Sequence, residues 1–578
     1  MRATGMGDGT RGPRRRRLAW LAVLASFLIV AAACGDTAET TTTTTGAPPE
    51  TTTTTSGGDT TTTAPPATTT TTAPPPPTTA PPGSIIEGGV LRIGLLSAPV
   101  FLDPTLSGDS NDRTVFRAIC EPLYTLDREQ HVQLALATAM PEVSEDGLTW
   151  TIPLREDAMF NDGTEFNAEA VKISLDRHLT HAESQRAGEI GSIASVEVVD
   201  DHTIQLNLNQ PDAILVFELG KRAGMIMSPA KLDELGDDFQ TDPTCVGPFR
   251  FVSREGDEVV VEKSDLYYGA ADVHLDGVEF IAITDRAARL ANLQSGDIHV
   301  AQLDPQIADD VVNDPDLVLD RAASDALMAM RVNANAADGR DNPPAPPDSP
   351  TAILEVREAF SLGLDRQVLA DVIVGGFAVA ACGHAGPLNP VDLGCEVQPA
   401  DPDGARALLE QAAADNGFEL PVPIEILAAE GRGQDVVAEA IQAMLAPVGF
   451  EITITIIDQG AVLDRGFAGD YEMIISPWTG RVDPGATYNT FFRCGGPINL
   501  TGFCDETMGA LLVEARAETD LAARQALYQQ IHEIVVAGYH YIPMYHPEQL
   551  LGIRPEVTGV FTYPDVEIEV QSAAFVNP

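Results

Sequence analysis

A charged and aromatic stretch near the end of the chain is the clearest candidate for ligand chemistry. The segment "SPWTGRVDPGATYNTFF" (residues 476–492) places Arg481 and Asp483 among aromatic side chains that include Trp478 and Tyr488. Aromatic walls with a few fixed polar groups are typical of concave ligand sites. The guanidinium of Arg481 suits a carboxylate. Asp483 suits an amine or pairs with Arg481 in a loop facing water, and Trp478 and Tyr488 either line the site or pack in the core.

Signatures of catalysis are missing from the sequence. There is no GxSxG elbow and no GxxxxGK[ST] phosphate loop, and the chain after residue 83 contains no GxGxxG motif. The segment "HEIVV" at His532 resembles half of a zinc-protease helix, but position 536 is Val. His178 and His181 lack a third ligand of suitable spacing. We therefore predict no enzyme activity, no cofactor and no metal site, with a secreted cell-wall or peptide hydrolase as an alternative.

Seven cysteines bear on compartment and on disulfide bonding. Setting Cys34 aside leaves an even number, which favours disulfides in an exported chain. The most local pairing joins Cys382 to Cys395 and Cys494 to Cys504, with Cys120 and Cys245 as the long-range remainder. Six cysteines permit fifteen pairings, so this solution is one among several.

The N-terminus has the form of an export signal. A basic start precedes an apolar run at residues 18–33, which is short for a membrane span and ends "VAAACGD". The ending resembles the lipobox of bacterial lipoproteins, in which the cysteine, here Cys34, is lipidated and becomes the mature N-terminus. Cleavage after Ala33 with an unmodified Cys34 is the alternative, and export through the general or the twin-arginine route stays open.

A low-complexity segment follows the signal. Residues 34–83 are dominated by Thr, Pro, Ala and Gly, a composition that cannot bury a core. Proline keeps such a segment extended, so we expect a disordered stalk. A lipidated cysteine and a stalk together predict a protein anchored to the outer face of the cell membrane.

The remaining residues are too many for a single hydrophobic core, so two or more lobes are expected. The formal net charge of −50 argues against nucleic acid as a partner. Strand and helix patterns alternate, as in "VPIEILAAE", "QDVVAEAIQAMLAPVG" and "FEITITIID", where Val437, Ile441, Met444 and Leu445 share one helix face. Such βαβ units predict an α/β fold with parallel strands.

Several blocks in order resemble one known family. These are "GGVLRIGLLSAPVFLDP", "EPLYTLD", "LALATAMPEVSEDGLTWTIPLREDAMFNDGTEFNAEAVKISLDR", "CVGPFRFVSRE", "VREAFSLGLDRQVLADVIVGGFA" and "RQALYQQIHEIVVAGYHYIPMYHPEQL". Together they resemble the extracytoplasmic solute-binding proteins of family 5, the peptide-, dipeptide- and nickel-type substrate-binding lipoproteins of ABC transporters. The resemblance covers nearly the whole chain after the stalk.

The resemblance implies a two-lobed periplasmic-binding-protein-like fold with the ligand in a cleft between the lobes. The expected division is a signal peptide at 1–33, the lipidated stalk at 34–83, lobe 1 at 84–335 and lobe 2 at 336–544. Residues 545–578 are expected to return to lobe 1, which also carries a subdomain at about 126–240.

The resemblance also directs attention to particular residues. In dipeptide-type members the position occupied here by Arg481 often carries an acidic residue that holds a peptide amine, so this chain departs from the pattern and favours an anionic group. In lobe 1, Asp103 of "FLDP" and Tyr124 are further ligand candidates, with a backbone turn as the alternative for Asp103. Arg331 and Asn333 of "MRVNAN" are candidates near the lobe crossing, unless Arg331 faces solvent on an edge strand.

The function implied is capture of a peptide or peptide-like, carboxylate-bearing solute by lobe closure and its delivery to a membrane permease. The expected partners are the solute, the ABC permease with its ATPase, and the membrane through the lipid anchor, with the protein itself a monomer. A surface or sensor lipoprotein without a role in transport is the alternative.

Overall fold

The computed structural model describes residues 83–109, 111–334, 349–430, 433–496 and 498–577. The predicted signal peptide, Cys34 and nearly all of the predicted stalk lie outside these residues. None of the helices within the described ranges combines the length and apolar character that crossing a bilayer requires.

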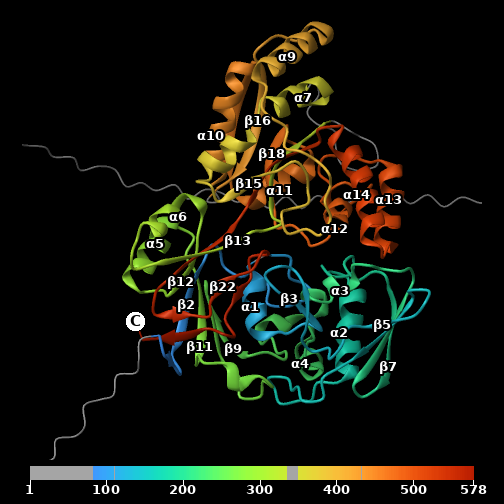
Figure 1. Ribbon diagram of the computed structural model, residues 1–578, viewed down its shortest axis with the longest axis vertical. Coiled ribbons are helices and arrows are strands. Elements are labelled where there is room, and N and C mark those ends of the chain that lie inside the picture. Colours follow the sequence, from blue (N-terminus) through green and yellow to red (C-terminus); the bar gives the residue numbers. More distant parts are fainter. Residues whose placement is uncertain (1–82, 110, 335–348, 431–432, 497, 578) are drawn as a thin grey trace, which may run out of the picture. The chain divides into compact units, whose positions relative to one another are not determined.

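The first large sheet has seven strands in the order β13-β20-β12-β2-β11-β10-β9. Their bounds are β2 (Val90–Leu95), β9 (Phe249–Glu255), β10 (Glu258–Lys263), β11 (Gly277–Ala282), β12 (Val300–Gln302), β13 (Val318–Ala322) and β20 (Gln549–Ile553). Strand β2 pairs in parallel with both β11 and β12, and lies between these green strands as the blue arrow in Figure 1. Its apolar residues Leu91, Ile93 and Leu95 are completely buried, as expected of a central parallel strand.

The second large sheet has six strands in the order β15-β19-β14-β18-β16-β17. Their bounds are β14 (Leu327–Val332), β15 (Ala378–Ala380), β16 (Val422–Ala429), β17 (Phe450–Ile457), β18 (Met473–Trp478) and β19 (Tyr541–Pro547). Strands β16 and β17 are parallel and joined through helix α10 (Gln434–Leu445), which confirms the predicted βαβ unit. On α10, Val437, Ile441 and Leu445 are buried, and Met444 packs partly buried against the same cluster.

A four-stranded antiparallel sheet, β5-β6-β8-β7, forms a smaller unit within the first half of the chain. Its strands are β5 (Glu142–Val143), β6 (Thr149–Pro153), β7 (Ile193–Asp200) and β8 (Thr203–Leu208), and helix α2 (Ala168–Thr180) packs against β7 and β8. The side chain of Asn167 accepts a hydrogen bond from the backbone N–H of Ala170, so Asn167 caps α2 as predicted.

The chain passes between the two large sheets twice, after β13 and after β19. Strand β14 pairs with β18 and β19, so the first crossing comes earlier than the predicted boundary at 335. The two connections touch: the Ser324 hydroxyl donates to the carbonyl of Pro547, and Nδ1 of His546 lies 2.8 Å from the carbonyl oxygen of Ala326. Two adjacent crossing strands are the usual form of a hinge between lobes.

Short strands and further helices complete the fold. The short strands are β1 (Ile85–Ile86), β3 (Tyr124–Leu126), β4 (Val132–Leu134), β21 (Val557–Thr558), β22 (Phe561–Thr562), β23 (Ile568–Glu569) and β24 (Ala574–Val576). The further helices are α1 (Asp112–Ile119), α3 (Leu215–Glu218), α4 (Pro229–Leu235), α5 (Arg286–Ser295), α6 (Pro305–Val312), α7 (Leu354–Leu362), α8 (Arg366–Val368), α9 (Pro402–Asn416), α11 (Gln459–Ala468), α12 (Pro484–Phe491), α13 (Glu506–Ala517) and α14 (Leu521–Val536). Strand β1 pairs antiparallel with β24, which brings the first and last described segments together.

Three disulfides are present, and they are the predicted ones. They join Cys120 to Cys245, Cys382 to Cys395 and Cys494 to Cys504. We call the part built around the seven-stranded sheet, with its four-stranded subdomain, the first body, and the part built around the six-stranded sheet the second body. The first disulfide spans 125 residues and joins the residue after α1 to the segment before β9, so it connects parts of the first body that are distant in sequence.

Candidate functional site

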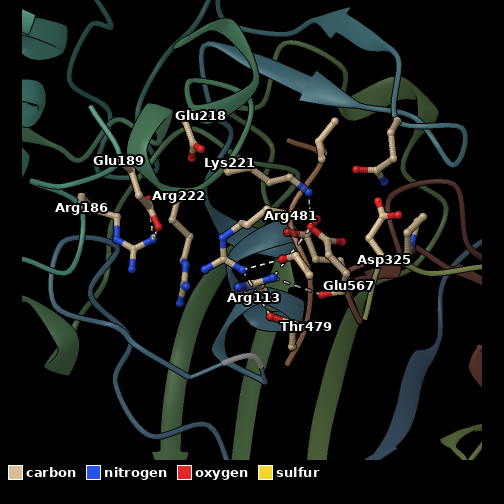
Figure 2. A pocket seen from close by; sticks show the side chains of 15 residues that line it. Arg113, Arg186, Glu189, Glu218, Lys221, Arg222, Asp325, Thr479, Arg481 and Glu567 are labelled. Atoms are coloured by element: carbon tan, nitrogen blue, oxygen red, sulfur yellow. Dashed lines mark hydrogen bonds and ion pairs between the residues drawn. The ribbon is translucent and has the colours of Figure 1, made fainter. Parts of the chain in front are cut away.

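A pocket dominated by charged side chains is the candidate site, and we call it the charged pocket. It is lined by Arg113, Gln130, Arg186, Glu189, Glu218, Lys221, Arg222, Asp325, Thr479, Gly480, Arg481, Val482, Pro564, Asp565 and Glu567. Figure 2 shows labelled cations and acids from several segments around one space. The lining combines the first-sheet body, its subdomain, the first crossing and the loop between β18 and α12. The pocket therefore lies where the two bodies meet.

The loop that carries Arg481 is held close to the first crossing by a glycine. Gly480 has φ +72°, and a Cβ at this position would lie 2.0 Å from the carbonyl oxygen of Asp325. Only glycine accepts both the left-handed backbone and this approach without strain. The contact sets the position from which Arg481 enters the pocket.

Arg481 has no carboxylate partner within ion-pair distance among the described residues. Its Nη1 donates to the carbonyl of Gly480 at 2.7 Å and to Oγ1 of Thr479 at 3.3 Å. Its guanidinium lies 4.7 Å from the ring centroid of Trp478, a cation–π contact. Burial and the nearby positive charge of Arg113 lower the pKa of Arg481 to about 10. The side chain remains a cation at neutral pH and is available for an anion.

Arg222 shares this condition, and Arg113 has only one long ion pair. Nη1 of Arg222 donates to Oγ of Ser107 at 2.8 Å and to the carbonyl of Asp109 at 2.9 Å, without a carboxylate at ion-pair distance in the described part of the chain. Burial and neighbouring arginines lower the pKa of Arg222 well below its ordinary value. Arg113 approaches Asp565 only at 4.0 Å. Such uncompensated positive charge favours a negatively charged ligand.

The other cations of the pocket are already neutralised. Lys221 forms an ion pair with Asp565, and Arg186 pairs with Glu189 at 2.8 Å. Outside the lining, Arg117 pairs with Glu567 at 3.0 Å. Among the described residues, these pairs leave Arg222 and Arg481 without a carboxylate at ion-pair distance, and Arg113 with only its long pair to Asp565.

Two acids in the lining also lack a cation within ion-pair distance among the described residues. Glu218, at the end of α3, is 8% exposed, and burial together with the charge of Glu189 raises its pKa to about 7. Asp325, in the first crossing, is 5% exposed, its Oδ1 accepts no hydrogen bond from a described residue, and burial raises its pKa to about 6. Both carboxyl groups pay a desolvation cost that a cationic ligand group would offset.

The free volume at the charged pocket is small, about 40 Å³. A second cavity of about 400 Å³ shares the side chains of Lys221 and Glu567 with it and is bordered by Leu134, Tyr267 and Tyr268. A solute of several residues therefore needs either this second space or a more open arrangement of the two bodies.

Asp483, predicted beside Arg481, has other partners. Its Oδ1 accepts from the backbone N–H of Gly485 at 2.8 Å and from the hydroxyl of Tyr528, and Nε of Arg524 lies 3.7 Å from Oδ2. The alternative of an Arg481–Asp483 pair facing water does not match the structure, because Asp483 is buried and caps helix α12.

Two candidates from the first body lie outside the lining of the charged pocket. Asp103 is completely buried and receives two hydrogen bonds from Arg177, at 2.9 and 2.8 Å. The hydroxyl of Tyr124 donates to the carbonyl of Ala139 at 3.1 Å. Both side chains have partners that hold the fold together.

The second-body candidates are also internal. Arg331 donates to Oγ of Ser476 at 2.8 Å and lies over the ring of Phe491, so it does not face solvent on an edge strand. Asn333 is buried and donates to backbone carbonyls. Tyr488 is completely buried in an aromatic cluster. Trp478 is not among the residues that line the pocket, but its ring contacts the guanidinium of Arg481.

Sequence reasoning missed most of the lining, including Arg113, Arg222 and Glu218. One signal was present: in "ILVFELGKRAGMIM", Glu218, Lys221 and Arg222 stand between two apolar runs. Charges in such a setting are buried with partners or face a ligand. For metals, the described residues contain no group of three or more His, Cys, Asp or Glu side chains placed to hold an ion.

Comparison with known proteins identifies relatives over most of the chain. The family described as "Bacterial extracellular solute-binding proteins, family 5 Middle" matches residues 131–499. The glutathione-binding protein GsiB of Pectobacterium atrosepticum is 27% identical over 512 residues, which cover 84% of this chain and 94% of the relative.

Solved structures share the fold. DppA from Helicobacter pylori, in complex with the peptide STSA, superposes with a TM-score of 0.72 at 24% identity, covering 85% of this chain and 99% of that protein. AgaA from A. tumefacien R10, in complex with agropinic acid, gives a TM-score of 0.70 at 25% identity, covering 83% and 98%. These likenesses confirm the predicted two-lobed α/β fold.

Proposed function

Because the chain belongs to the bacterial extracellular solute-binding proteins of family 5, we propose that it captures a peptide or peptide-like, carboxylate-bearing solute for an ABC importer. The relatives named for glutathione and for a bound peptide support this class of solute. They are named as binding proteins, in agreement with the predicted lack of enzyme activity.

The observation that carries the proposal is the position of Arg481. Its guanidinium lines the charged pocket with Arg113 and Arg222. Among the described residues, Arg481 and Arg222 donate to hydroxyl and carbonyl oxygens and have no carboxylate within ion-pair distance. A guanidinium fork binds a carboxylate through two parallel hydrogen bonds. The solute carboxylate would therefore supply the charge that the pocket lacks.

Closure of the two lobes on the solute would follow from the same arrangement. Arg113 and Arg222 belong to the first body and Arg481 to the second, so a carboxylate bound by arginines from both sides favours the closed state. The closed form would then be recognised by a permease and its ATPase. We further propose that the protein acts as a monomer on the outer face of the cell membrane, anchored through a lipid on Cys34.

The test is a thermal-shift screen of the purified protein with di- to pentapeptides. Each peptide is supplied free, C-amidated and N-acetylated, and the proteins compared are the wild type, Arg481→Ala and the control Arg250→Ala. Arg250 is an exposed arginine paired with Glu262 on the adjacent strand, so its removal changes the total charge equally. A bound solute raises the melting temperature by mass action.

We expect free peptides to raise the melting temperature of the wild type and of Arg250→Ala. Amidation of the C-terminus and the change Arg481→Ala should each reduce this shift strongly. A screen in which no peptide shifts the wild type would exclude peptides as the solute. A shift that survives both amidation and Arg481→Ala would exclude Arg481 as the carboxylate anchor.

A further inference from the structure

We propose that the solute carries a cationic group, an amine or guanidinium, in addition to its carboxylate, and that Glu218 binds this group. The inference rests on the proposed function, because it concerns the same pocket and the same solute. It narrows the class from carboxylate-bearing compounds to zwitterions and assigns the cation to the first body, away from Asp483.

Glu218 is set apart by its lack of partners. It lines the charged pocket, is 8% exposed, and makes neither an ion pair nor a hydrogen bond to a described residue through its carboxylate. The other acids on its side of the pocket are engaged, since Glu189 pairs with Arg186 and the nearby Asp212 with Arg516. A buried carboxylate without a donor is costly, and binding sites are where such a cost is retained.

The arginines of the pocket do not satisfy this carboxylate. Arg222 donates to Ser107 and Asp109, and Arg481 donates to Gly480 and Thr479. Figure 2 shows Glu218 on the same side of the pocket as Glu189, Arg186 and Arg222. Anionic and cationic groups without close partners thus share one cavity. A ligand with both charges would compensate both, whereas a simple anion would leave Glu218 without a partner and add repulsion.

The position of Glu218 also suits a short solute. Glu218 is the last residue of the helix α3, two residues before the Gly220 that borders the second cavity, and Lys221 borders both cavities. The remainder of a peptide held at Arg481 and Glu218 therefore has space in the 400 Å³ cavity beside them.

The test uses calorimetric titration of the full protein with three matched peptides. Trialanine carries a terminal amine, and N-acetyl-Ala-Lys-Ala carries a side-chain amine. N-acetyltrialanine carries no cationic group. The proteins are the wild type, Glu218→Gln and the control Glu142→Gln, an exposed carboxylate of the same subdomain. Glutamine keeps the shape of Glu218, and a melting curve of each variant verifies folding.

We expect the wild type to bind at least one of the two amine-bearing peptides, trialanine or N-acetyl-Ala-Lys-Ala, at least tenfold more tightly than it binds N-acetyltrialanine. Glu218→Gln should remove this preference, and Glu142→Gln should retain it. Equal affinity of the wild type for all three peptides would overturn the role of the cation while leaving the carboxylate-binding function intact. A preference that survives in Glu218→Gln would exclude Glu218 as the cation-binding residue. Failure of all three to bind would exclude the peptide solute itself, and the inference with it.

Discussion

Arg516 of α13 donates two hydrogen bonds to a single carboxylate oxygen of Asp212, from Nη2 at 2.7 Å and from Nε at 2.9 Å. The same Nη2 lies 2.8 Å from the carbonyl of Glu189, a residue of the charged pocket. Asp212 is buried in the subdomain, and α13 belongs to the second body. This pair joins the two bodies at the edge of the pocket, independently of any solute.

We therefore predict that Arg516→Ala weakens solute binding without removing a pocket residue. Loss of one partner leaves Asp212 buried and unpaired in the closed state, and such losses cost about 3–5 kcal/mol in buried pairs. Part of this cost disappears when the lobes open, so we expect affinity to fall about 10- to 100-fold in titration calorimetry. The affinity of Arg516→Lys should lie between those of the wild type and Arg516→Ala, because an ammonium group keeps the charge but lacks the planar set of donors of a guanidinium. Unchanged affinity in Arg516→Ala would show that the pair does not contribute to closure.

The stability of the protein should depend on pH through Glu218. Its pKa is about 7 in the folded protein against an ordinary value of 4.5, so the folded form retains a proton that the unfolded form releases. This contribution is fully present below pH 4.5 and is lost as the pH rises to 7. The groups acting on Glu218 are Glu189, Asp212, Arg481 and Arg516.

We expect Glu218→Gln to match the wild type at pH 4.5 and to be more stable at pH 8. The difference should be on the order of 3 kcal/mol, since the pKa of Glu218 is raised from 4.5 to about 7 and each pKa unit corresponds to about 1.4 kcal/mol. Urea unfolding at both values of pH measures it. A variant less stable than the wild type at pH 8 would mean that the ionised carboxylate is stabilised in the solute-free protein.

Tyr488 provides a test of the sequence-based assignment of the cleft wall. Its side chain is completely buried beside His384 and Tyr528, and its hydroxyl has no hydrogen-bond partner among the described residues. Tyr488→Phe removes that hydroxyl, so we expect unchanged solute affinity and a free energy of unfolding higher by about 1 kcal/mol. A loss of solute affinity without a change in stability would show that the Tyr488 hydroxyl takes part in solute binding.

The disulfides should differ in what they contribute to stability. The Cys120–Cys245 bond closes a loop of 125 residues, and the Cys494–Cys504 bond closes one of only 10. Loop entropy in the unfolded chain then assigns about 4–5 kcal/mol to the first and about 3 kcal/mol to the second. Guanidinium unfolding of the two double-alanine variants compares them directly. Equal losses would indicate that effects other than loop entropy dominate.

Local patterns in the sequence predicted the elements well. The cap at Asn167 and the buried face of α10 depend on neighbouring residues, which a single sequence displays. The disulfides followed from proximity in sequence for two pairs and from elimination for the third. The first lobe crossing was expected too late, because the pairing partners of β14 are far away along the chain.

The site was less predictable because its parts converge only after folding. The aromatic residues near Arg481 in the sequence single it out as a candidate. Arg113 and Glu218 lie on elements that are distant from Arg481 in the sequence and approach it only in the folded protein. For Asp483 the local signal was overlooked: an Asp followed by Pro is a typical start of a helix, and Asp483 indeed caps α12. The same type of residue serves a turn at Asp103, whose carboxylate accepts from the backbone of Thr105.

The pairing of β1 with β24 has a mechanical consequence. Gly83 and Asn577 are hydrogen-bonded at 2.9 Å, so the first and last described residues leave the fold from the same place on the first body. A force applied to the chain upstream of Gly83 would act on this short strand pair and on the first body. It would not act on the crossing segments at Ser324 and Pro547. A tether attached upstream of Gly83 would therefore restrain the first body and would leave the second body unrestrained.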